Sequence, residues 1–171
     1  MKTCFHAFAM CRSMFCAIPF PGNIWDEEAR DKMLLFLPIV GLEMGALWAG
    51  LAWLCGLLRL PALVKGLVLA IFPFLVAGFI HLDGYMDVTD AVKSCRSLER
   101  RREILKDSHV GAFAVIGCVL LMLAAFAFGC AGQGSTWIFC LVTVVSRCCS
   151  ALAVTVLRPM ATSQYAGSFR E

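Results

Sequence analysis

Three aspartates stand at helical spacing in the middle of the chain. Within HLDGYMDVTDAVKS, residues 81–94, Asp83, Asp87 and Asp90 occupy relative positions zero, four and seven, which share one face of a helix. Carboxylates crowded in this way repel one another unless a cation offsets their charge, and hard oxygen ligands favour magnesium, manganese or calcium. The spacing therefore predicts a divalent metal site, with magnesium as the expected cofactor. The alternative is a solvated acidic face.

A basic segment, RSLERRREILKDS (96–108), follows the aspartates. Its alternation of arginines with glutamates is typical of an exposed helix held by surface ion pairs. Phosphoryl transfer also needs guanidinium groups beside a carboxylate-bound metal, because both neutralise charge on phosphate oxygens. Lys106 and Asp107 are predicted catalytic residues facing the aspartate helix, or else Asp107 caps the next helix together with Ser108. The candidate phosphate-binding residues are Arg96, Arg100, Arg101, Arg102, His81 and Ser108.

These residues belong to a very apolar chain. Of its 171 residues 60% are hydrophobic, and the mean hydropathy is +0.80, which is outside the range of soluble domains. A membrane helix takes about 20 apolar residues. Four stretches of that kind carry at most one charge each, and they are 33–58, 61–80, 110–132 and 136–157. The sequence therefore predicts an all-α, polytopic transmembrane helical bundle, forming one membrane domain over 1–171.

The distribution of basic residues orients these spans. The polar segment 81–109 holds six of the 15 lysines and arginines, so the positive-inside rule places it in the cytoplasm. The aspartates then lie at the cytoplasmic end of the second span, where Pro73 is expected to produce a bend. The first residues are predicted to form an interfacial helix that ends before Pro19. The net charge of +3 suits phosphorylated substrates and anionic membrane lipids, whereas nothing in the pattern indicates nucleic-acid binding.

Three further ionisable residues have simple interpretations. His81 precedes the aspartates and is either an interfacial residue or one that orients Asp83. Glu43 and Arg147 lie inside predicted spans, where charges are costly and usually paired. We expect these two to pair with each other or with backbone carbonyl groups.

HLDGYMDVTDA followed by ERRREILKDSHVGAFAVIG resembles the signature of cobalamin synthase, the adenosylcobinamide-GDP ribazoletransferase family. The likeness covers 78–117 closely and extends more loosely to FAMCRSMFCAIPFP, Trp25 and the FLPIVG stretch. It implies a magnesium-dependent, multi-pass enzyme of the bacterial inner membrane with a cytoplasmic active site. The implied reaction is attack by the hydroxyl group of alpha-ribazole, or of alpha-ribazole 5'-phosphate, on adenosylcobinamide-GDP with release of GMP.

The resemblance also transfers roles residue by residue. The acidic motif of the family corresponds to Asp83, Asp87 and Asp90, and its KDS segment corresponds to residues 106–108. The aspartates are also similar to those of CDP-alcohol phosphotransferases, although the later Gly and double-Asp pattern of that family is not reproduced. Members of the cobalamin synthase family usually continue through further apolar helices, so we expect this chain to be C-terminally truncated.

Two alternatives to this function therefore stay open at this point. One is a lipid-type CDP-alcohol phosphotransferase, and the other is an inactive membrane fragment or subunit whose carboxylates merely bind a cation. An oligomer is compatible with each of them.

Overall fold

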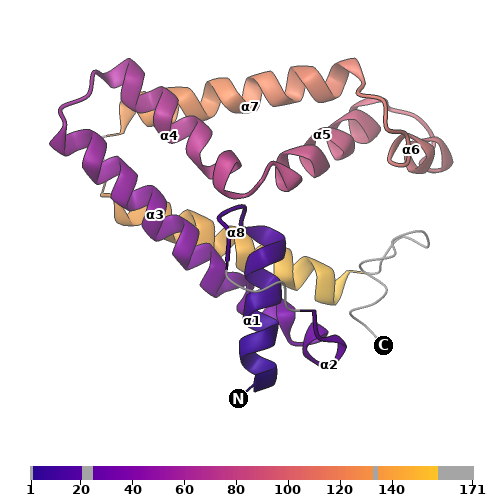
Figure 1. The fold of residues 1–171 in the computed structure, drawn as a ribbon. Coiled ribbons are helices and arrows are strands. Elements are labelled where there is room, and N and C mark those ends of the chain that lie inside the picture. The colour runs from indigo at the N-terminus through magenta and orange to yellow at the C-terminus, as the bar shows by residue number, and fades with distance from the viewer. Residues whose placement is uncertain (1, 21–24, 133–134, 158–171) are drawn as a thin grey trace. The chain divides into compact units, whose positions relative to one another are not determined.

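The structure is a computed structural model that describes residues 2–20, 25–132 and 135–157 (Figure 1). Within these ranges every regular element is a helix, which confirms the predicted all-α class. The chain divides into two compact units, one made of residues 1–54 and 134–171 and the other of residues 55–133. The single membrane domain over 1–171 stays a prediction.

The first unit is built around α3, whose small residues let a second helix approach. A methyl group added at Gly45 would lie 2.6 Å from the Cα atom of Cys140 on α8, so the two backbones nearly touch, as in many membrane helix pairs. The helix α1 packs against α2 and η1. The elements of this unit are α1 (Lys2–Phe15), α2 (Glu27–Arg30), η1 (Met33–Phe36), α3 (Leu37–Leu57) and α8 (Trp137–Val156).

A partly buried ion pair joins α1 to α3. Arg12 is only 7% exposed, and it donates from Nε and NH2 to Glu43 Oε1 at 2.9 and 2.8 Å. The expectation that Glu43 would pair with Arg147 or a carbonyl group is therefore wrong. A carboxylate inside a span needs a cation, and the folding of α1 onto this unit supplies one from 31 residues away. NH2 of Arg147 lies 3.4 Å from Met44 Sδ.

The second unit places α7 along both α4 and α5 (Figure 1). A methyl group at Gly129 would lie 2.9 Å from the Cα atom of Gly66, so α4 and α7 are also in backbone contact. Lys65 Nζ donates to the Gly132 carbonyl at 2.9 Å, so the N-terminal end of α4 lies beside the C-terminal end of α7. The elements are α4 (Ala62–Val76), α5 (Ile80–Lys93), α6 (Leu98–Ile104) and α7 (Ala112–Ala131).

The predicted second span, 61–80, is broken. α4 and α5 differ in direction by 94°, and the break falls at residues 77–79 rather than at Pro73, which stays inside α4. The N–H of Phe79 donates to the Phe74 carbonyl at 3.1 Å, and the N–H of Gly78 donates to the Leu75 carbonyl at 3.2 Å. This pair of bonds is a Schellman motif, which ends a helix at a left-handed residue. Gly78 has the required positive φ of 69°.

The break changes how the spans are counted. The residues 33–57, α7 and α8 are each long and apolar enough to cross a membrane, and the bent pair of α4 and α5 adds a fourth if it forms one span. α4 alone has 15 residues, a length of about 22 Å at the helical rise, which is short of the hydrocarbon core of about 30 Å. The described residues therefore contain three spans, or up to four.

Candidate active site

The helix α5 carries all three aspartates. The helix predicted for this segment is confirmed, but it is a separate element after the bend and not the end of the preceding membrane helix. Asp83 and Asp87 are exposed and Asp90 is half-buried. The charges of Asp83 and Asp90 both act on Asp87, as expected for carboxylates in successive turns of one helix.

The aspartates fit a magnesium ion that is shared with a substrate. No three His, Cys, Asp or Glu side chains in the described part of the chain are close enough to hold a metal ion by themselves. Magnesium in phosphoryl-transfer sites is commonly held by one or two carboxylates together with substrate phosphates. Asp83 and Asp87 are exposed on one helix, one turn apart, and therefore suit that mode of binding. The metal itself stays a prediction.

Asp90 makes a different contact, with the start of α7. A methyl group at Gly111 would overlap both carboxylate oxygens of Asp90, so the carboxylate fills the space of the missing side chain. Gly111 is the N-cap of α7, where the partial positive charge of a helix N-terminus favours an anion. Sequence reasoning missed Gly111, although a glycine directly before a long apolar run was a signal for a helix start.

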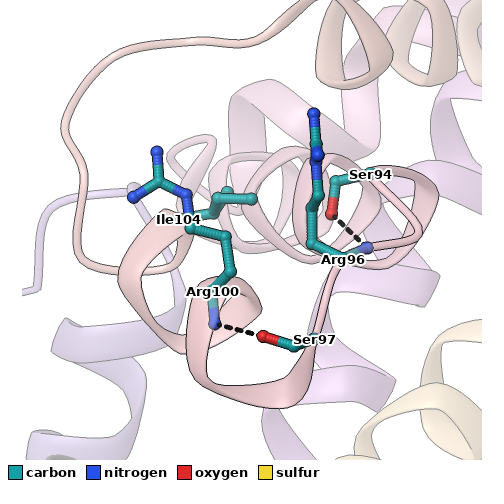
Figure 2. Close-up of a pocket in the computed structure, with 5 residues that line it drawn as sticks. All are labelled: Ser94, Arg96, Ser97, Arg100 and Ile104. Carbon is teal, nitrogen blue, oxygen red and sulfur yellow. Dashed lines mark hydrogen bonds between the residues drawn. The ribbon is translucent and has the colours of Figure 1, made fainter.

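A pocket of about 640 Å³ lies between the end of α5, the helix that carries the aspartates, and α6. Figure 2 shows two arginine side chains beside it, with both guanidinium groups extending away from the backbone turn. The backbone N–H groups of these arginines donate to serine hydroxyl groups, both at 3.4 Å. The pocket thus combines cationic and hydroxyl groups, which suits an anion. Its lining residues are Ser94, Arg96, Ser97, Arg100 and Ile104.

The six predicted phosphate-binding residues do not all line this pocket. Arg96 and Arg100 line the pocket, whereas Arg101 and Arg102 do not. Arg100 also pairs with Glu103 at 2.6 Å, but both side chains are more than 60% exposed, so this contact is weak and a phosphate group could replace it. Ser108 is an exposed loop residue, and His81 is exposed in the first turn of α5.

Asp107 pairs with a histidine rather than with the aspartate helix. Its Oδ1 accepts the backbone N–H of His109 at 3.0 Å and lies 2.5 Å from Nδ1 of the same residue. The hydrogen bond from the imidazole lowers the pKa of Asp107, and in return the Asp107 carboxylate raises the pKa of His109. Since α7 starts at Ala112 with Gly111 as its N-cap, the alternative that Asp107 and Ser108 cap it is wrong. Lys106 is exposed and forms no ion pair with the described aspartates.

Comparison with known proteins assigns the chain to a family. A match to the family described as cobalamin-5-phosphate synthase covers residues 7–171. The chain belongs to this family. The chain is similar to two curated relatives named adenosylcobinamide-GDP ribazoletransferase. The relative from Clostridium perfringens is 42% identical over 74% of this chain and 51% of its own length. The relative from Lachnoclostridium phytofermentans is 34% identical over 93% of this chain and 61% of its own length. The chain thus spans about half the length of the first relative. No solved structure matches it.

As a member of the cobalamin-5-phosphate synthase family, the chain keeps the predicted catalytic segment within its second unit. The aspartate helix α5, the pocket and the Asp107–His109 pair all fall between residues 80 and 109. All of these residues therefore lie within the second unit. Ser94, Ser97 and His109 were not singled out from the sequence, because serines and a lone histidine carry no distinctive pattern.

Proposed function

We propose that this chain carries the active site of an adenosylcobinamide-GDP ribazoletransferase. In this reaction alpha-ribazole, or alpha-ribazole 5'-phosphate, joins adenosylcobinamide-GDP and GMP is released. The observation that carries the proposal is the run of Asp83, Asp87 and Asp90 along α5, followed at the end of the same helix by the arginine-lined pocket. The names of the relatives support the same substrates.

Different residues of the second unit would have different roles in a phosphoryl transfer. Asp83 and Asp87 would hold magnesium, which supplies charge neutralisation at the pyrophosphate oxygens. Arg96 and Arg100 would bind phosphate oxygens at the pocket, which begins at Ser94, the C-cap of α5. Asp90, packed on the N-terminus of α7, keeps α5 in register with its neighbour. No covalent enzyme intermediate is needed, since positioning and electrostatics account for most of the catalysis of such reactions.

The proposed active site lies on the cytoplasmic side of a membrane. The apolar helices make this a membrane protein, and the basic residues on and around α6 suit the cytoplasmic face of a bacterial inner membrane, where anionic lipids lie. The nucleotide-linked substrate would reach the site from the cytoplasm.

The test uses the 171-residue chain in proteoliposomes and measures GMP release from adenosylcobinamide-GDP with alpha-ribazole or its 5'-phosphate present. Release should require magnesium and should fall by about 10²-fold or more in Asp83→Asn and Asp87→Asn, as for loss of a main electrostatic contact. Asp31→Asn is the control, because Asp31 is an exposed aspartate of the first unit. Unchanged GMP release in Asp83→Ala, Asp87→Ala and Asp90→Ala would contradict the proposal.

Two other outcomes identify the alternatives. Release of labelled CMP from a CDP-linked donor would indicate a CDP-alcohol phosphotransferase. A folded chain that forms no product with both substrates present would indicate a non-enzymatic membrane fragment.

A further inference from the structure

The loop between α6 and α7 holds an aspartate and a histidine in the relation of a catalytic dyad. The imidazole Nδ1 of His109 is 2.5 Å from Asp107 Oδ1. In a neutral ring with the proton on Nδ1, this bond fixes the tautomer and leaves the lone pair of Nε2 available. The His109 side chain is 90% exposed, so a substrate has free access to Nε2.

The imidazole ring is not needed to hold the loop. The turn is made by the backbone N–H of His109, which donates to the same Asp107 oxygen at 3.0 Å. Every replacement of His109 except proline keeps that N–H. The local fold therefore does not account for the ring, and removing the ring tests chemistry rather than structure.

The loop leads directly to the aspartate helix. His109 lies two residues before Gly111, so their Cα atoms are at most about 7 Å apart. Gly111 in turn touches the carboxylate of Asp90. The dyad therefore lies two residues along the chain from the contact between α7 and Asp90, which is the last aspartate of the run on α5.

We propose that His109, oriented by Asp107, is the general base that removes the proton from the attacking hydroxyl group. The inference rests on the proposed function. As the acceptor oxygen forms its bond to the phosphorus atom, its proton passes to Nε2 of His109, and the bond between that phosphorus and the GMP oxygen breaks. GMP leaves as a phosphate anion that needs no proton, and the imidazolium ion then returns its proton to water.

The electrostatic surroundings suit this role. The charged group that acts on the ring is Asp107, on which Arg100 of α6 acts in turn. Asp90 of α5 contacts Gly111, two residues further along the chain. Asp107 raises the pKa of His109 above its usual value of 6.5, which makes the imidazole a stronger base. A carboxylate bound to a metal is a poorer base, because the cation stabilises its charged form.

The experiment is a pH profile of GMP release by the same proteoliposomes. His109→Ala should lower kcat by about 10²–10⁴-fold, the usual contribution of a general base, with little change in KM, and added imidazole should restore part of the rate. Asp107→Asn should move the acidic limb of the profile to lower pH, because the imidazole loses the charge that raises its pKa. His6→Gln is the matched control, since His6 forms a similar contact with Asp26 at 2.7 Å in the first unit.

The outcomes separate the two proposals. Wild-type turnover together with a His109→Ala variant of unchanged kcat and pH profile would overturn the role of His109 alone. A loss of rate that imidazole does not restore, accompanied by a raised KM, would overturn it as well. If the wild-type chain releases no GMP from adenosylcobinamide-GDP under any condition, the proposed function itself fails.

Discussion

The carboxylate of Asp90 on α5 occupies the space that a side chain of Gly111 would need at the start of α7. This contact joins the aspartate helix to the only described helix that packs along both halves of the bent pair. Two residues that are 21 positions apart in the sequence thereby set where the last of the three aspartates lies.

Gly111→Ala should therefore displace Asp90. We expect a loss of about 1–3 kcal/mol in the free energy of unfolding, as for other overpacked sites, together with reduced GMP release. Denaturant unfolding and the proteoliposome assay measure the two effects. Gly56→Ala is the control, because a methyl group there meets nothing within 4 Å.

A double-mutant cycle distinguishes this contact from a general effect of the substitution. Combining Gly111→Ala with Asp90→Ala removes the overlapping carboxylate, so the double variant should be destabilised by less than the sum of the single variants. Strict additivity would show that Gly111 and Asp90 do not interact.

The pocket predicts different effects for neighbouring arginines. Arg96→Gln and Arg100→Gln should each raise the KM for the phosphorylated substrate by about tenfold, equivalent to the loss of one charge-assisted hydrogen bond. Arg102→Gln should have a smaller effect, because Arg102 does not line the pocket. Equal effects of all three substitutions would mean that the basic segment acts through its net charge alone, and increased salt would then weaken all three variants similarly.

The Asp107–His109 pair gives a defined pH dependence. The folded-state pKa of Asp107 is lowered and that of His109 is raised. The stabilising effect of Asp107 is lost as the pH falls through its lowered pKa, and that of His109 is lost as the pH rises through its raised pKa. The pair is therefore fully formed between the unfolded-state values of about 4 and about 6.5. NMR titration should show a lower His109 pKa in Asp107→Asn; an unchanged value would exclude the contact.

The bend between α4 and α5 depends on the left-handed conformation of Gly78. Gly78→Ala should cost about 1 kcal/mol or more, because a β-carbon is unfavourable at a φ of 69°. Gly78→Asn should cost less, since asparagine is the next most common residue at this position of a helix end. Thermal unfolding of both variants, with Gly50→Ala as the control for an open position, measures the difference. Equal stability of all three would mean that the bend does not require this conformation.

Features that depend on local pattern were predictable from the sequence. The apolar runs predicted as 33–58, 110–132 and 136–157 match the spans at 33–57, 112–131 and 137–156, because a bilayer selects helices by length and composition. The helical spacing of Asp83, Asp87 and Asp90 likewise placed them together on α5, since a helix brings positions three and four apart to one face. The bend also depends on a local feature, the glycine at position 78, but the sequence analysis expected it at Pro73, because proline is the more familiar cause of a bend in a helix.

Contacts between residues that are far apart in the sequence became visible only in the packing of the helices. Glu43 pairs with Arg12, which is 31 positions away in the sequence, and Asp90 contacts Gly111 because α5 packs on α7. Such contacts follow from close helix packing at small residues, which no periodicity in the sequence reports. The charge pattern of the basic segment likewise did not indicate that Arg96 and Arg100 line the pocket while Arg101 and Arg102 do not, because the pocket forms only where the end of α5 and α6 come together.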